Sequence, residues 1–291
     1  MSHIVANGLS LLPELAVIEV AGEDRVSFVH GQLTNHIQNL GDAFRLAGYC
    51  TPQGRLQATM RVYAKDEKLF MVMAADLVEG FMKRFGMFIL RSKVTLRKAD
   101  ELKVAGVVAP KSVALPEVDH VALGEVVVAR VADVDDLARA YLIGTEEALN
   151  ALAEDKVENT NWWLGEVKAG LPWVVLATKE AFVPQWINMD RVGGVVFNKG
   201  CYPGQEIISR VQHIGSTPRR SVLLKTEASV EVVAGDDVMI DGVANGKVVM
   251  AATVGNETWA FAQVPLKALE GGVFAIKDTT FTVEPLPYAF A

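Results

Sequence analysis

The sequence predicts an α+β protein in which two related α+β halves are followed by a small antiparallel β-barrel. A chain of 291 residues is long for a single core, so two or three packed modules are expected. The order of predicted strands and helices in the first hundred residues recurs between about 103 and 160. After about residue 216 the sequence pattern changes to short predicted strands separated by frequent turns. We therefore expect divisions at 1–102, 103–216 and 217–291.

The first half begins with a short apolar strand from Ala16 to Val20. Apolar residues then recur at steps of three and four, which predicts an amphipathic helix that begins near Asp24 and that Gly31 can split. These residues are Val26, Val29, Leu33, Ile37 and Leu40.

A hairpin follows, with strands near 43–50 and 55–64 joined at residues 51–54. A third strand runs from Leu69 to Met73. Asp76 is expected to cap a helix whose buried side carries Leu77, Phe81, Phe85 and Phe88. The strand Val94 to Arg97 closes this half.

In the second half we expect strands near 103–109, 124–131 and 139–144. Thr145 opens a helix through Ala153, and another helix begins at Thr160. The barrel is predicted from four pairs of turn residues: Asp241-Gly242, Asn245-Gly246, Gly255-Asn256 and Gly271-Gly272.

Composition excludes several classes of protein. The formal net charge of −7 opposes sequence-independent binding to nucleic acid, because that affinity comes from neutralising phosphates. No signal peptide or membrane span is recognisable, so we expect a cytoplasmic protein without a membrane partner. The two cysteines, Cys50 and Cys201, suggest no disulfide framework and cannot build a metal site alone, so no permanent metal is expected.

The most unusual segment is Lys199-Gly200-Cys201-Tyr202-Pro203-Gly204-Gln205-Glu206. Its glycines and proline predict a tight, specifically shaped loop. Lys199 lies two residues before Cys201, and a nearby cation stabilises the thiolate, which makes the cysteine a better nucleophile or metal ligand. The alternative is that Cys201 is a small buried residue in a turn. Gln205 and Glu206 are either ligands or the polar start of the next helix.

The run KGCYPGQEIISR, with FVPQWINMDRVGGVVFNKG before it, resembles the signature of the YgfZ branch of folate-binding proteins. This branch is related to the T-protein (aminomethyltransferase) of the glycine cleavage system. Further similar segments are VAGEDRVSFVHGQLTN, CTPQGRL, KAGLPWV and EPLPY, so the resemblance covers nearly the whole chain. It implies a T-protein-like ring of three domains, with two ferredoxin-like halves and a last small barrel.

The resemblance also implies a tetrahydrofolate site and a role in assembling or maintaining iron–sulfur enzymes, including a tRNA methylthiotransferase. The expected catalytic pair is Cys201 with Lys199, and Cys201 is a candidate transient iron–sulfur ligand. Any link to tRNA would be indirect. The expected folate contacts are Trp162, Leu15, Tyr202, Gln205, Glu206 and Arg210.

Two departures from the related proteins bear on activity. T-proteins carry an acidic pair shortly after the glycine of the first hairpin, whereas this chain has Gln57 and Ala58 there. Aminomethyl transfer by that mechanism is therefore not expected, because no carboxylate can relay the proton. Where relatives often read Glu-Ala-Gly, this chain has Lys168, which cannot accept hydrogen bonds from a pterin. Glu166 or another acid could substitute, or folate recognition is weaker.

The aromatic residues and the cations each have a structural alternative. Trp162 matches a tryptophan placed to contact folate, but Trp162 and Trp163 can also simply pack in a helix core. The other family aromatic is Leu15 here, so stacking from that side is missing. Four cations either meet the folate glutamate tail or form a solvated face: Lys199, Arg210, Arg219 and Arg220.

Three functions follow from these observations. The first is a folate-binding accessory factor whose Cys201 holds iron–sulfur material, exchanges with another thiol, or reacts with a one-carbon adduct. The second is a folate-dependent one-carbon transferase or demethylase, with Glu206 or the Cys201 thiolate as a new acid or base. The third is a pure interaction module with a vestigial folate site.

Overall fold

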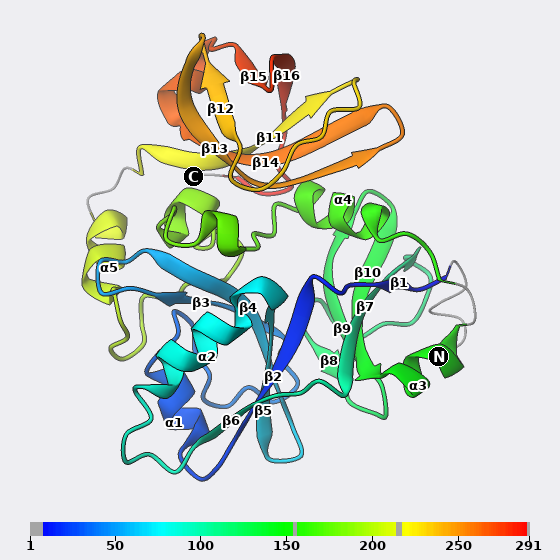
Figure 1. The fold of residues 1–291 in the computed structure, drawn as a ribbon, viewed down its shortest axis with the longest axis vertical. Helices are drawn as coiled ribbons and strands as arrows, with labels where there is room; N and C mark the ends of the chain where they lie inside the picture. Colours follow the sequence, from blue (N-terminus) through cyan, green and yellow to red (C-terminus); the bar gives the residue numbers. More distant parts are fainter. Residues whose placement is uncertain (1–7, 154–155, 214–216, 290–291) are drawn as a thin grey trace.

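The computed structural model describes residues 8–153, 156–213 and 217–289, which form two five-stranded sheets and a closed barrel (Figure 1). The first sheet has the antiparallel order β3-β4-β5-β2-β6. Its strands are β2 (Leu15–Ala21), β3 (Arg45–Cys50), β4 (Leu56–Lys65), β5 (Lys68–Ala74) and β6 (Thr95–Lys98). The predicted strands and the 51–54 hairpin turn are confirmed.

The predicted helix from Asp24 to Leu40 is wrong beyond its first turns. Helix α1 spans only Arg25–His30 and ends at Gly31. Leu33 instead pairs with Tyr49 of β3 in an isolated bridge. The apolar residues at 33, 37 and 40 are nevertheless buried, because the loop that carries them packs on the sheet. Packing of the loop on the sheet therefore explains why these apolar residues are spaced as in an amphipathic helix.

The helix after β5 consists of a 3₁₀ turn η1 (Ala75–Leu77) and α2 (Val78–Gly86). The prediction that Asp76 caps it is wrong. Its carboxylate accepts a hydrogen bond from the backbone N–H of Leu176, at 2.9 Å, and so joins two distant segments. Phe81 and Phe85 are buried as expected, but Phe88 is 42% exposed beyond the end of the helix.

The second sheet has the order β1-β7-β10-β9-β8. Its strands are β1 (Ser10–Leu11), β7 (Leu102–Pro110), β8 (Val121–Ala122), β9 (Val127–Val134) and β10 (Leu137–Thr145). Helix α3 (Glu146–Leu152) begins where predicted, with the Thr145 hydroxyl accepting a hydrogen bond from the Ala148 N–H. The strand expected from 124 begins at Val127.

The segment between the second sheet and the barrel carries α4 (Thr160–Lys168), which begins as predicted. Two 3₁₀ turns follow, η2 (Leu176–Thr178) and η3 (Pro184–Ile187), and then α5 (Gln205–His213). In Figure 1 this segment crosses between the barrel and the two sheets. It therefore brings the unusual cysteine loop next to the first sheet.

The predicted C-terminal barrel is confirmed and closes with the order β11-β14-β13-β12-β15-β16. The strands are β11 (Arg219–Thr226), β12 (Asp237–Ile240), β13 (Val243–Val254), β14 (Glu257–Pro265), β15 (Phe274–Ile276) and β16 (Thr279–Glu284), with the 3₁₀ turn η4 (Leu266–Glu270). Closure leaves no long unpaired edge strand.

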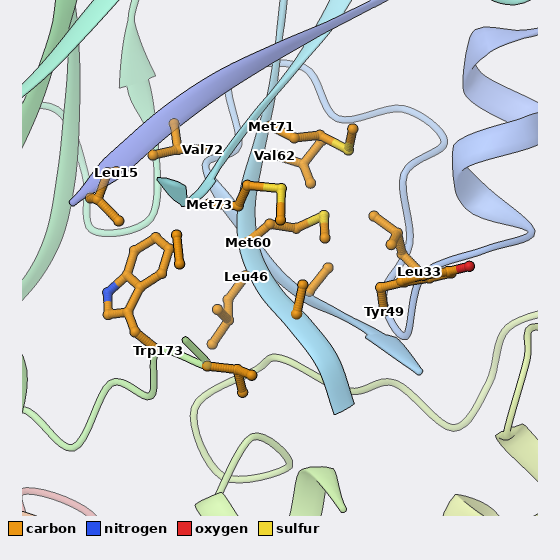
Figure 2. Packing of buried hydrophobic residues seen from close by; sticks show 14 of the residues in the cluster. Leu15, Leu33, Leu46, Tyr49, Met60, Val62, Met71, Val72, Met73 and Trp173 are labelled. Atoms are coloured by element: carbon orange, nitrogen blue, oxygen red, sulfur yellow. The ribbon is translucent and has the colours of Figure 1, made fainter. Parts of the chain in front are cut away.

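One large hydrophobic cluster joins residues of both sheets and the barrel, for example Met60, Tyr141 and Phe261. Figure 2 shows its part around the first sheet, where the indole of Trp173 lies close to Leu15. Interiors of this kind are close-packed, so the cluster holds the two sheets and the barrel together.

Candidate functional site around Cys201

The two cysteines lie in opposite environments. Cys50, at the end of β3, is buried, and burial raises the pKa of its thiol. Cys201 is exposed, just before α5. Since the thiolate is the reactive form, chemistry at sulfur falls on Cys201. The interpretation of Cys201 as a small buried turn residue is wrong.

The cysteine loop is shaped by its contact with the first hairpin. Gly204 has φ +84°, and a Cβ there would lie 2.5 Å from the Thr51 carbonyl oxygen and 2.8 Å from Gly54 Cα. A side chain at 204 would therefore collide with backbone that cannot move aside. The KGCYPG and CTPQG segments, which are 150 residues apart in the sequence numbering, thus form one unit.

Lys199 is buried and holds the loop against the end of α1. Its ammonium donates hydrogen bonds to the carbonyl oxygens of His30 (2.6 Å) and Leu33 (2.7 Å), and it lies 4.6 Å from the ring centroid of Tyr202. Burial lowers the pKa of Lys199 to about 8, and the negative charge of a Cys201 thiolate opposes this shift. The direct contacts of Lys199 are therefore structural.

Tyr202 and Gln205 also support the loop. Tyr202 is buried, and burial raises the pKa of its hydroxyl. Within the described part of the chain this hydroxyl has no hydrogen-bond partner. Gln205 donates a hydrogen bond to the Lys199 carbonyl at 3.3 Å. The Tyr202 ring and the Gln205 amide thus both contact Lys199.

The remaining polar residues of this region do not converge. Glu206 and Arg210 form an exposed ion pair one helical turn apart, at 3.0 Å. Arg219 donates to Asn245 in the barrel, and Arg220 pairs with the buried carboxylate of Asp190. The four cations predicted as a possible cluster are thus bound to separate partners or exposed.

Trp162 lies elsewhere, inside α4. It is fully buried, its ring fills the space above Gly106, and it meets the Tyr141 ring at a centroid distance of 4.6 Å. Its indole N–H has no partner among the described residues. The flat face of Trp162 therefore packs in the core, as expected if this tryptophan stabilises the helix rather than contacting folate.

Glu166 and Lys168 lie near Trp162 and are both engaged. The buried Glu166 carboxylate accepts hydrogen bonds from Arg139 (2.8 Å), Tyr141 (2.7 Å) and Trp173 (2.8 Å). Burial, reinforced by the Glu166 charge, raises the pKa of Tyr141 well above its usual value. Lys168 pairs with Asp135 at 2.6 Å. Glu166 therefore has little capacity left to replace the pterin-binding carboxylate.

The residues predicted to contact tetrahydrofolate do not form one site in this structure. Leu15 is buried at the start of β2 beside Trp173 (Figure 2), and Trp162 is in α4. The other four lie on the cysteine loop and α5, on the opposite side of the view in Figure 1. The Glu166 carboxylate already accepts hydrogen bonds from Arg139, Tyr141 and Trp173, and Trp162 is buried. The predicted contact residues, as arranged here, therefore do not fit tetrahydrofolate.

Sequence reasoning missed two histidines next to the loop. The rings of His30 and His36 stack at 5.6 Å, and His36 lies 3.3 Å from the Asn198 side-chain oxygen. Burial, with the charges of Lys199 and His36, lowers the pKa of His30. No periodicity marks this pair, because its contact to residue 198 depends on the docked loop. Over residues 8–153, 156–213 and 217–289, no group of three His, Cys, Asp or Glu side chains is placed to hold a metal ion.

The fold is that of the glycine cleavage aminomethyltransferases. The crystal structure of aminomethyltransferase T from Bartonella henselae matches with a TM-score of 0.72 and 15% identity, over 96% of this chain and 85% of that chain. The fold class predicted from the sequence is thereby confirmed. None of the helices in the described ranges is long and apolar enough to cross a membrane.

The sequence is similar, over almost its whole length, to proteins named tRNA-modifying protein YgfZ. The protein from Klebsiella pneumoniae (strain 342) is 27% identical over 303 residues, which cover 97% of this chain and 93% of that protein. Those from Escherichia coli O45:K1 and Enterobacter sp. (strain 638) are each 28% identical over 304 residues, covering 97% and 96% of this chain and 93% and 92% of theirs. No protein-family model matches the chain. The resemblance that the cysteine signature indicated is confirmed.

Proposed function

We propose that this protein is an accessory factor in tRNA modification that acts through the thiol of Cys201. The observation that carries the proposal is the contrast between an exposed Cys201 on a loop of defined shape and a buried Cys50. The similarity to proteins named tRNA-modifying supports the process. The net charge of −7 favours action on a modifying enzyme rather than directly on tRNA.

The chemistry that the loop supports is transient. A stable iron–sulfur cluster usually needs four protein ligands, and Cys201 supplies one. We propose that the thiolate binds an open iron position of an iron–sulfur enzyme while the enzyme is assembled or repaired. A cysteine thiolate of that enzyme later replaces it, so that one Fe–S bond forms as the other breaks. Lys199 keeps the loop fixed on α1 through its hydrogen bond to the His30 carbonyl.

Aminomethyl transfer is disfavoured at the residues that replace the acidic pair. Gln57 is buried in β4, and its amide nitrogen has no hydrogen-bond partner within the described residues. Ala58 is buried beside it, opposite Tyr49 of β3. Neither side chain can accept and relay a proton as a carboxylate does. Because the expected folate contacts do not converge, tetrahydrofolate carries no step in the proposal.

The test is complementation of a bacterial strain that lacks its own homologous protein. Wild type, Cys201→Ser and Cys50→Ala would be compared at equal protein levels. The readouts are methylthiolated tRNA and the activity of an iron–sulfur enzyme. Rescue by wild type and Cys50→Ala, but not by Cys201→Ser, is expected. Equal rescue by Cys201→Ser would remove the thiol from the function.

A further inference from the structure

The loop between α2 and β6 exposes an unusual apolar surface. Met87, Phe88 and Leu90 are 67%, 42% and 88% exposed, within four consecutive residues. Single exposed apolar side chains are normal, but a contiguous group of this kind marks an interaction site. By contrast, Phe81 and Phe85 of α2 stack in the core at a centroid distance of 4.6 Å. Helix α2 thus anchors the loop without covering its apolar residues.

The backbone of this loop turns an apolar side chain outward at some cost. Leu90 has φ +45°, a left-handed conformation that is unfavourable for a non-glycine residue. The loop also borders a surface hollow of about 790 Å³, lined by Asp24, Ser27 and residues 88–92. A protruding leucine beside a hollow is a shape that can interdigitate with a partner surface.

The charge around the loop is opposite in sign to that of the whole chain. Lys83, Arg84 and Arg91 are exposed in and beside it, although the chain carries −7 overall. Lys83 and Arg91 have no ion-pair partner in the described part of the chain. Lys93, by contrast, is neutralised by Glu23 at 2.7 Å. These unpaired cations favour an acidic partner, with attraction that weakens as salt increases.

The loop and Cys201 are linked through the six residues of α1. At the start of α1, the Asp24 carboxylate accepts a hydrogen bond from the Lys93 N–H at 2.8 Å. At its end, the Lys199 ammonium donates to the His30 carbonyl. Six helical residues span only about 9 Å, because the rise is about 1.5 Å per residue. In Figure 1 the loop, α1 and the segment before α5 lie along the same edge of the molecule.

We propose that residues 83–92, with the adjoining face of α1, form a docking surface for an acidic, leucine-bearing segment of the protein that Cys201 serves. A standard interface covers about 800 Å² on each partner, enough to include both the loop and the thiol. The role of the partner rests on the proposed function; the binding does not.

The binding test uses a synthetic amphipathic helix of about 15 residues with Leu on one face and Glu on the other, and its Lys counterpart. The protein variants are Met87→Ser/Leu90→Ser and Arg91→Glu. The control is Val243→Ser/Val273→Ser, which removes two side chains that are 65% and 57% exposed on the barrel. Circular dichroism melting would verify that each variant folds.

Fluorescence anisotropy is expected to show binding of the acidic helix to wild type and the barrel control. Binding should be at least about tenfold weaker for both loop variants, and weaker in high salt. Equal binding by the loop variants, or preference for the Lys helix, would overturn the proposal. So would binding of wild type to phosphatidylglycerol vesicles instead of the helix, or a loop-dependent dimer in sedimentation.

The complementation test in cells distinguishes this inference from the proposed function. Met87→Ser/Leu90→Ser should fail to restore tRNA methylthiolation, while its Cys201 is alkylated by iodoacetamide at the wild-type rate. If Cys201→Ser restores function but the loop variant still loses helix binding, the proposed function fails and the docking surface stands. If the loop variant restores function fully, the docking surface has no part in it.

Discussion

Lys199 and Cys201 lie two residues apart, yet the lysine is buried and the cysteine exposed. The buried ammonium of Lys199 is held by the backbone carbonyls of His30 and Leu33, which belong to the first half of the chain. A buried ammonium is costly unless it is hydrogen-bonded, so these two hydrogen bonds allow the lysine to fix the loop.

Replacing Lys199 with Met should destabilise the protein by about 2 kcal/mol at pH 7, because two buried carbonyls lose their donor. The pKa of Lys199 is lowered to about 8 in the folded state, so between about pH 8 and 10.5 the unfolded chain binds more protons. Wild-type stability should therefore rise with pH, relative to the variant, by about 1 kcal/mol from pH 7 to 9.

Urea unfolding at several pH values would measure this difference. Lys103→Met is the matched control, since Lys103 is exposed and donates to one carbonyl, that of Asp100. It should show neither effect. A wild-type advantage that falls between pH 7 and 9 would contradict the assignment.

Two Glu–Arg pairs offer a second comparison at the scale of single residues. Glu166→Gln should cost about 3–5 kcal/mol, because the buried Arg139 guanidinium loses its counter-charge. Glu206→Gln should change stability by no more than about 0.5 kcal/mol, since its pair with Arg210 is exposed. Equal effects in chemical denaturation would show that the Glu166 network is not desolvated.

At the scale of elements, the cysteine loop depends on close backbone contact with the first hairpin. Gly204→Ala should destabilise the protein by about 2–4 kcal/mol, because the added methyl group meets the Thr51 carbonyl at an unfavourable φ. Gly200→Ala, in the same loop, should be nearly neutral, since nothing lies within 4 Å of its added Cβ. Melting temperatures would compare them; similar melting of the two variants would refute the docked loop.

Most elements could be predicted from local patterns, and the failures have a common cause. Strands such as β4 and β5 are apolar runs between turns, and Thr145 is a helix cap that acts locally. The failures involve residues whose partners are distant. Leu33 follows helical spacing but pairs with Tyr49, and Asp76 resembles a cap but binds the Leu176 N–H.

At the candidate site, too, local features could be predicted from the sequence and distant contacts could not. The shape of the loop and the importance of Cys201 could be read from glycine, proline and cysteine in one segment. The partners of Lys199 could not, because they are backbone carbonyls 169 and 166 positions away. Nor could composition decide whether Trp162 faces a ligand or the Gly106 backbone.

At the scale of the whole molecule, part of the barrel packs into the same hydrophobic cluster as the sheets, while the barrel interior also forms a cluster of its own. Met250 and Phe261 of the barrel belong to the same cluster as Met60 and Trp173. The Tyr288 hydroxyl also donates to the Gly170 carbonyl at 2.9 Å, across the barrel boundary. A shared core favours cooperative unfolding.

We therefore expect a single unfolding transition in urea. Tryptophan fluorescence, which reports on α4 through Trp162 and on the barrel through Trp259, should coincide with far-UV circular dichroism. Two separated midpoints would show that the barrel unfolds by itself. A fluorescence change that precedes the loss of secondary structure would carry the same meaning.

The distribution of sulfur has a consequence under oxidative stress. Met60, Met71 and Met73 are enclosed in the core (Figure 2), whereas Met87 and Cys201 are exposed. Peroxide would reach the outer sulfurs first, giving a sulfoxide at 87 and a sulfenic acid at 201. Damage would thus fall on the surface that we propose meets other proteins while the fold persists, and both lesions can be reversed by cellular reductases and thiols.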